Sequence, residues 1–93
     1  MGAFDWDLRT AGANRREHGV EFADATAIFE DEEALTVTDG ITAVDEQRYL
    51  TLGRDTLGRL LVVGYTWRGE RIRVLSARRA TVAERRQHRG RKA

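Results

Sequence analysis

The sequence predicts an α+β domain, in which an antiparallel β-sheet follows two N-terminal helices and precedes one C-terminal helix. Residues 8–29 carry apolar side chains at helical spacing, whereas residues 34–77 contain four apolar segments separated by turn residues. The chain is 93 residues long, which is the length of one small domain. We expect this domain to cover residues 1–89 and a basic, disordered tail to follow over residues 90–93.

The first part of the chain is predicted to form a short strand and two helices. Residues 4–6 alternate apolar and polar side chains, which is typical of an edge strand. Asp7 is a suitable cap for a helix over residues 8–18, and Gly19 is a suitable residue to end it. A second helix is expected over residues 21–29, because four apolar residues recur there at helical spacing. These residues are Phe22, Ala25, Ile28 and Phe29.

Four strands and a helix are expected in the rest of the chain. The segment 60–67 is apolar almost throughout, so we expect a central strand that is buried on both faces. The last strand alternates arginine with isoleucine and valine, so one of its faces should be polar. Thr81 and Glu84 have the spacing of a capping box, which predicts a short basic helix. The expected strands are 34–38, 48–53, 60–67 and 71–77, with a loop over 39–45.

Charge is distributed unevenly along the chain. Residues 1–46 contain 12 acidic and 3 basic residues, a net −9, whereas residues 47–93 contain 3 acidic and 13 basic residues, a net +10. Fifteen of the 16 basic residues are arginine, which binds phosphate through a planar fork of donors. This asymmetry is typical of a nucleic-acid-binding surface. Alternatively, the two halves neutralise each other in the fold, and the arginine content reflects genomic base composition.

Several classes of protein are excluded or disfavoured. The chain has no cysteine, which excludes disulfides, thiolate metal sites and cysteine nucleophiles. His18 and His88 lie far apart in sequence and no zinc-binding spacing joins them, so we expect neither a metal nor another cofactor. The sequence has no apolar run of membrane-spanning length and no secretion signal, so we expect a cytoplasmic protein without a membrane partner.

One reaction suits an arginine-rich domain of this composition. In RNA cleavage by attack of the substrate's own 2′-hydroxyl, the nucleophile comes from the RNA. The protein then needs cations to stabilise the charged phosphorane and groups that take up and return a proton. Arginines can supply the charge, and Glu46 or His18 can supply a proton-transfer group.

Five segments of the chain together match the pattern of a known family. They are Phe4-x-Trp6-Asp7, Asn14-x-x-x-His18-Gly19-Val20-x-Phe22, Glu46-x-Arg48, Leu52-Gly53 and Arg73-Val-Leu-Ser76-Ala77-Arg78-Arg79-Ala80-Thr81-x-x-Glu84-Arg85. With these segments the chain resembles the BrnT toxins over roughly residues 3–88. The resemblance implies a RelE-like fold and a bacterial ribonuclease that inhibits growth as part of a type II toxin–antitoxin system. It also implies neutralisation by a BrnA-like antitoxin in a 2:2 complex, with operator DNA bound mainly through the antitoxin.

The resemblance and the chemistry together give the candidate site residues. Those expected to take part in cleavage are Arg48, Arg78, Glu46 and His18. Those expected to bind RNA are Arg71, Arg73, Arg79 and Arg85.

Each candidate also has a plain structural interpretation. Arg48 can form a surface ion pair, and Arg78 and Arg79 can be solvated turn residues. His18 can be a helix-end residue, and Glu84 is most simply the capping-box partner of Thr81. Two other functions stay open: a RelE-fold toxin that acts on another target such as gyrase, and a binding module without catalysis.

Overall fold

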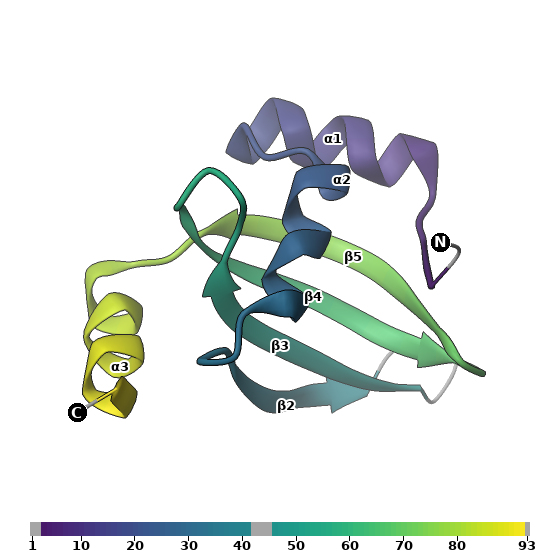
Figure 1. The fold of residues 1–93 in the computed structure, drawn as a ribbon. Coiled ribbons are helices and arrows are strands. Elements are labelled where there is room, and N and C mark those ends of the chain that lie inside the picture. The colour runs from purple at the N-terminus through teal and green to yellow at the C-terminus, as the bar shows by residue number, and fades with distance from the viewer. Residues whose placement is uncertain (1–2, 42–45, 93) are drawn as a thin grey trace.

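A computed structural model describes residues 3–41 and 46–92, which form a mixed α+β fold around a five-stranded sheet (Figure 1). The strand order is β1-β5-β4-β3-β2. The helices are α1 (Leu8–His18), α2 (Phe22–Ala25) and α3 (Val82–Lys92), and a 3-10 helix, η1 (Thr26–Glu30), follows α2. The strands are β1 (Phe4–Asp5), β2 (Leu35–Ile41), β3 (Gln47–Arg54), β4 (Leu60–Arg68) and β5 (Arg71–Arg79).

The sheet is mixed rather than wholly antiparallel. Strands β2 to β5 form the expected antiparallel meander, whereas β1 pairs with β5 in parallel. Tight hairpin turns impose an antiparallel direction on neighbouring strands, but β1 reaches the edge of β5 after a long connection that fixes no direction. Strand β2 also continues to Ile41, into the expected loop, and the rest of that loop lies outside the described residues.

The first helix begins and ends as predicted. The side chain of Asp7 accepts a hydrogen bond of 3.0 Å from the backbone of Thr10, and Gly19 has a φ of 71°, in the left-handed region. The expected second helix is instead divided into α2 and the tighter η1. The hydroxyl of Thr26 donates to the carbonyl of Ala23 at 2.9 Å, a local contact that competes with regular α-helical bonding at this junction.

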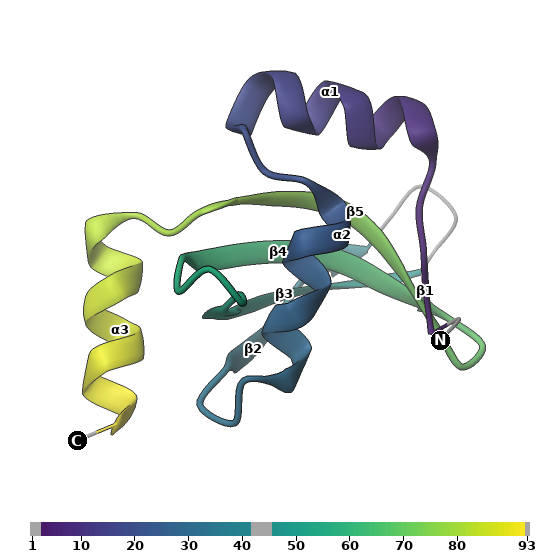
Figure 2. The same ribbon diagram turned by 45° about the horizontal axis from the view of Figure 1, so that its top comes forward.

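The two faces of the sheet bury separate apolar cores. Helices α1 and α2 cover one face, as Figure 2 shows, over a core that includes Phe22, Ile28, Leu61 and Val63. Leu52, Leu60 and Val62 form a smaller cluster on the opposite face. Strand β4 therefore contributes to both cores, and its burial from Leu60 to Thr66 confirms the predicted central strand.

Helix α3 borders the second, smaller core. Its capping box is formed as predicted, since Thr81 and Glu84 exchange side chain–backbone hydrogen bonds of 2.8 and 3.2 Å. The helix continues through residues 90–92, which we expected to form a disordered tail, and Ala93 lies outside the described residues. No helix in the described part of the chain has the length and apolar character that a membrane crossing needs.

Candidate nucleic-acid interface

Three arginines lie on the sheet face opposite α1 and α2. Two of them, Arg48 on β3 and Arg73 on β5, pair with Thr66 on β4 from its two sides. Arg48, Thr66 and Arg73 therefore form one cross-strand row. Arg78 pairs with Val62, four residues along β4 from Thr66 and on the same face. At about 3.3 Å per residue, Arg78 lies about 13 Å from that row along the sheet. We call Arg48, Arg73 and Arg78 the arginine face.

Arg48 carries a charge that the described residues leave uncompensated. Its side chain is half-buried, and its Nε atom is buried without a hydrogen-bond acceptor in the part of the chain that the structure describes. A buried N–H without an acceptor costs about 1–3 kcal/mol, so such groups are rare in folded proteins. The arrangement leaves Arg48 available for an anionic ligand.

Arg73 is held by a carboxylate at the sheet edge. Asp5 on β1 accepts hydrogen bonds from Arg73 at 3.2 Å and from Arg71 at 3.3 Å. Desolvation raises the pKa of Asp5, but the hydrogen bonds and charges of these two arginines outweigh it and lower the pKa below its ordinary value. Asp5 is therefore ionised at neutral pH, and it holds the guanidinium of Arg73 on the side of β5 that faces β1, away from β3 and Arg48.

Arg78 forms a two-pronged ion pair with Glu84 at the start of α3. Its Nη1 and Nη2 atoms donate to the two carboxylate oxygens, each at 2.9 Å, and Nη1 also donates to the carbonyl of Arg79 at 3.1 Å. These contacts use three of the five N–H donors of a guanidinium, which leaves the edge formed by Nε and Nη2 for another acceptor. The hydrogen bond from Arg78 is the main cause that lowers the pKa of Glu84 to about 2.

The hydrogen bonds with Thr81 confirm that Glu84 is the capping-box residue, and the ion pair with Arg78 is a second contact that the sequence did not indicate. Glu84 accepts from the backbone of Thr81 at 2.8 Å while it holds Arg78. Because its pKa is about 2, Glu84 is a carboxylate at neutral pH and a poor proton acceptor. Its contribution is to fix the orientation of Arg78.

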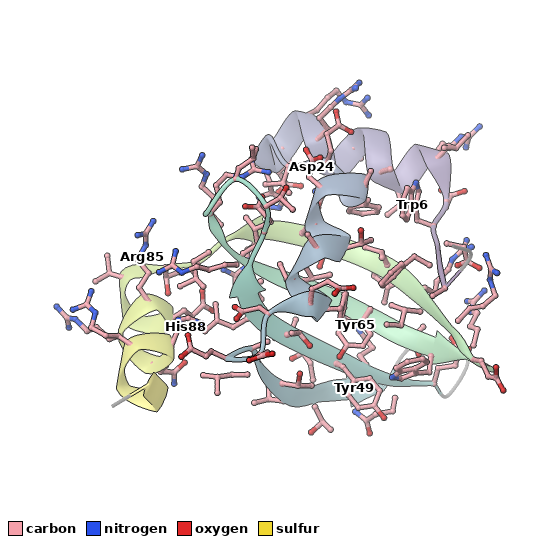
Figure 3. The ribbon with its side chains drawn as sticks, viewed as in Figure 1. Trp6, Asp24, Tyr49, Tyr65, Arg85 and His88 are labelled. Carbon is pink, nitrogen blue, oxygen red and sulfur yellow. The ribbon has the colours of Figure 1, made fainter. Side chains whose placement is uncertain are left out.

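The other candidate residues lie around or away from the arginine face. Glu46, immediately before β3, pairs with Arg68 at 3.4 Å. Arg79 pairs with Leu61 across the sheet, which places it on the face of the larger core, and it is exposed. Arg85 is exposed on α3 (Figure 3).

His18 lies in a different layer from the arginine face. It is the last residue of α1, which packs on the opposite side of the sheet, and its Nε2 atom lies 3.9 Å from the carboxylate of Glu17. The structure therefore does not bring His18 together with Arg48 and Arg78. A catalytic role for His18 stays a prediction.

Gly64 and Ser76 belong to the arginine face, although the sequence did not mark them as site residues. They pair with each other across β4 and β5, in the row between those of Arg48 and Arg78. A Cβ atom at Gly64 would lie 2.7 Å from the Oγ of Ser76, so only glycine fits against this serine without a shift. A glycine inside an otherwise apolar strand was the available sequence signal.

An apolar groove adjoins the arginine face beside Glu84. Its volume is about 470 Å³, and side chains from β2, β3, β4 and α3 line it. Leu35, Leu50 and Leu52 form much of its apolar wall.

The family model described as "Ribonuclease toxin, BrnT, of type II toxin-antitoxin system" matches residues 6–84. The chain belongs to this family. The match confirms the resemblance that the sequence motifs indicated, and it includes Arg48, Arg73, Arg78 and Glu84. Membership in a type II toxin–antitoxin family implies a protein antitoxin as partner.

A solved BrnT structure has the same fold. The 1.1 Å crystal structure of the Brucella abortus ribonuclease toxin BrnT superposes with a TM-score of 0.62 at 21% sequence identity, covering 84% of this chain and 95% of that one. The likeness confirms the mixed α+β architecture. No curated protein matches the chain.

Proposed function

We propose that this BrnT-family chain is a metal-independent endoribonuclease that cleaves RNA on the arginine face. The observation that carries the proposal is the buried Nε of Arg48, which has no acceptor among the described residues. A phosphate oxygen is the acceptor that best fits a guanidinium fork. Arg73 in the same row and the free edge of Arg78 supply further donors toward the same strand of RNA.

The proposed reaction uses the RNA's own 2′-hydroxyl as nucleophile. The hydroxyl loses its proton to a base, its oxygen bonds to the adjacent phosphorus, and the bond from phosphorus to the 5′-oxygen breaks. An acid returns a proton to that oxygen, so the products carry a 2′,3′-cyclic phosphate and a 5′-hydroxyl. Arginine donors stabilise the additional negative charge of the phosphorane, and one such donor is worth about 2.7–4 kcal/mol.

Glu46 and His18 are the proposed proton-transfer groups, and the fold separates them. Glu46 precedes Arg48 by two residues and contacts Arg68, whereas His18 ends α1 in the other layer. Glu46→Gln and His18→Ala should therefore be compared over a range of pH. Loss of one limb of the pH–rate profile identifies a variant's group as the acid or base, and an unchanged profile removes that residue from the mechanism.

The RNA-binding role includes Arg73 and three further arginines. Arg71 joins the arginine face through Asp5, and Arg73 lies within that face. Arg79 and Arg85 are exposed near the start of α3 and would contact the RNA as it leaves the face.

The toxin role requires an antitoxin. We propose a BrnA-like antitoxin that binds this chain in a 2:2 complex and contacts operator DNA, and we place both proteins in the cytoplasm with the RNA substrate. Expression of the chain alone should slow bacterial growth, and co-expression of the antitoxin should restore it. Light scattering should give the mass of two copies of each chain, and a strict 1:1 complex would contradict this assembly.

The deciding experiment incubates the purified chain with total RNA in the absence of ribosomes. We expect cleavage in EDTA, products with 2′,3′-cyclic phosphate ends, and no cleavage of substrates that lack 2′-hydroxyls. Arg48→Ala is the inactive variant, and Arg16→Ala on the exposed surface of α1 is the matched control. Cleavage of 2′-deoxy substrates, or loss of cleavage in EDTA with the fold intact, would overturn the mechanism.

A further inference from the structure

A cluster of potential metal ligands lies between α3 and the turn that joins η1 to β2. One ligand atom each from Asp31, Glu33 and His88 lies within 4.8 Å of the others. Asp31 and Glu33 belong to the turn, and His88 projects from α3 on the side that faces the sheet (Figure 3). Two chain segments that are distant in sequence therefore present an imidazole and two carboxylates to one point.

His88 is a buried side chain without a hydrogen bond at this point. Its side chain is 2% exposed, and its Nε2 atom has no hydrogen-bond partner among the described residues. The nearest carboxylate oxygen, Oδ2 of Asp31, lies 3.6 Å from that nitrogen, beyond hydrogen-bonding distance. Buried imidazole nitrogens are normally paired, and a metal ion is one of their common partners.

The carboxylate of Asp31 is oriented by the backbone around it. One oxygen accepts from the backbone of Glu33 at 2.9 Å, and the other accepts from the backbone of Arg54 at 2.9 Å. Hydrogen bonds of this kind fix a ligating carboxylate in its charged form and in one orientation.

Three arginines lie near the proposed site. Arg54, Arg85 and Arg89 line a neighbouring cavity together with His88. Arg54 directs its guanidinium to the carbonyl of Gly58 at 2.9 Å. Asp31 and Glu33 thus supply two negative charges close to an imidazole nitrogen that has no hydrogen-bond partner among the described residues.

We propose that Asp31, Glu33 and His88 bind one divalent transition-metal ion, with Zn²⁺ as the preferred cation, and that the ion joins α3 to the η1–β2 turn. One imidazole and two carboxylates form a ligand set that zinc accepts, with water in the remaining position. His88 follows Glu84 by four residues, one helical turn, so a bound ion steadies the helix that presents Glu84 to Arg78. His88 lies beyond residues 6–84, so the family match does not cover the complete ligand set.

The test uses the full chain, freed of metal, and inorganic Zn²⁺ as the probe. Calorimetry should give one ion per chain, and the melting temperature should rise and saturate with added Zn²⁺. Glu33→Gln should weaken binding by about tenfold or more without endangering the fold, because Glu33 is exposed. Glu32→Gln is the matched control, since it removes the same charge from the neighbouring exposed residue.

Two further variants distinguish Zn²⁺ binding at this site from Zn²⁺ binding by the other histidine of the chain. His88→Gln should abolish the saturable rise in melting temperature, and His18→Ala should leave it intact. Co²⁺ bound in place of Zn²⁺ should give a visible absorption band that is lost in Glu33→Gln and His88→Gln. The absence of stoichiometric binding, or binding that neither variant weakens, would overturn the proposal whether or not the chain cleaves RNA.

Discussion

Arg48 and Arg78 lie on the same sheet face but differ in what compensates their charge. Arg78 donates two hydrogen bonds of 2.9 Å to Glu84, so its charge is neutralised and its orientation is fixed. Arg48 has a buried Nε without an acceptor in the described part of the chain. The difference indicates two roles: Arg48 supplies uncompensated charge, and Arg78 supplies a fixed edge of donors.

The two environments also have opposite consequences for stability. An unpaired buried donor lowers stability by about 1–3 kcal/mol, which a binding site can retain because a ligand satisfies the donor. The Arg78–Glu84 pair instead joins the end of β5 to the start of α3 and adds to stability. Catalysis and folding should therefore respond differently when each arginine is replaced.

The largest expected effect is on cleavage by Arg48→Ala. Removal of one electrostatic donor should lower the cleavage rate by about 10²–10³-fold. The free energy of unfolding should rise by at most about 1–3 kcal/mol, because the substitution removes the unpaired buried donor and no described partner is lost. Arg48→Lys should recover part of the rate, because it keeps the charge and loses the fork. Single-turnover assays and urea unfolding measure the two quantities, and a fully active Arg48→Ala variant would contradict the assignment.

Arg78→Ala should lower both cleavage and stability. The rate should fall by a similar factor, about 10²–10³, because the fixed donor edge is lost. The carboxylate of Glu84 is then left without its partner, so the free energy of unfolding should fall by roughly 1–3 kcal/mol. The double variant Arg78→Ala with Glu84→Gln should recover part of the stability and none of the rate. Recovery of the rate would show that Arg78 acts only through the fold.

The stability of the ion pair should depend on pH in acid. The folded-state pKa of Glu84 is about 2, below its ordinary value of 4.5, so the unfolded chain takes up the proton more readily. The stabilisation is therefore complete above about pH 4.5 and is lost as the pH falls toward 2. Urea midpoints at pH 7 and pH 3 should differ more for the wild-type chain than for Glu84→Gln. Equal pH dependence in the two proteins would assign the acid sensitivity to other carboxylates.

The sequence predicted those parts of the fold that depend on local signals. Asp7, Gly19 and the Thr81–Glu84 capping box determine helix ends through contacts within a few residues, and all three are confirmed. The apolar run at 60–67 likewise indicated a strand that is buried on both faces, and the structure confirms this for residues 60–66, whereas Trp67 is exposed. The parallel pairing of β1 with β5, by contrast, was not predicted, because no short turn connects the two strands.

The sequence predicted only part of the candidate interface, because the rest depends on contacts between residues that are distant in the chain. Strand alternation indicated that Arg71 and Arg73 share a polar face, but it could not show which arginines already have partners. The contacts of Asp5 with Arg73 and of Asp31 with His88 join residues more than fifty positions apart. Such pairs depend on the register of the sheet and the docking of α3, and neither leaves a mark in sequence spacing.

The smallest expected effect concerns the salt dependence of RNA binding, and it compares the two arginines directly. An arginine that contacts a phosphate releases a counterion from single-stranded RNA, so each contact adds about −0.7 to the slope of log affinity against log salt. Arg48 carries uncompensated charge, and Arg48→Ala should make the slope less steep by about 0.7. Arg78 is already paired with Glu84, so Arg78→Ala should change the slope by less.

Fluorescence anisotropy with a short, uncleavable 2′-deoxy oligonucleotide measures both slopes, with Arg16→Ala as the control. Equal changes for the two variants would mean that RNA displaces Glu84 from Arg78. A slope near zero for the wild-type chain would mean that the basic half of the sequence is occupied by internal ion pairs.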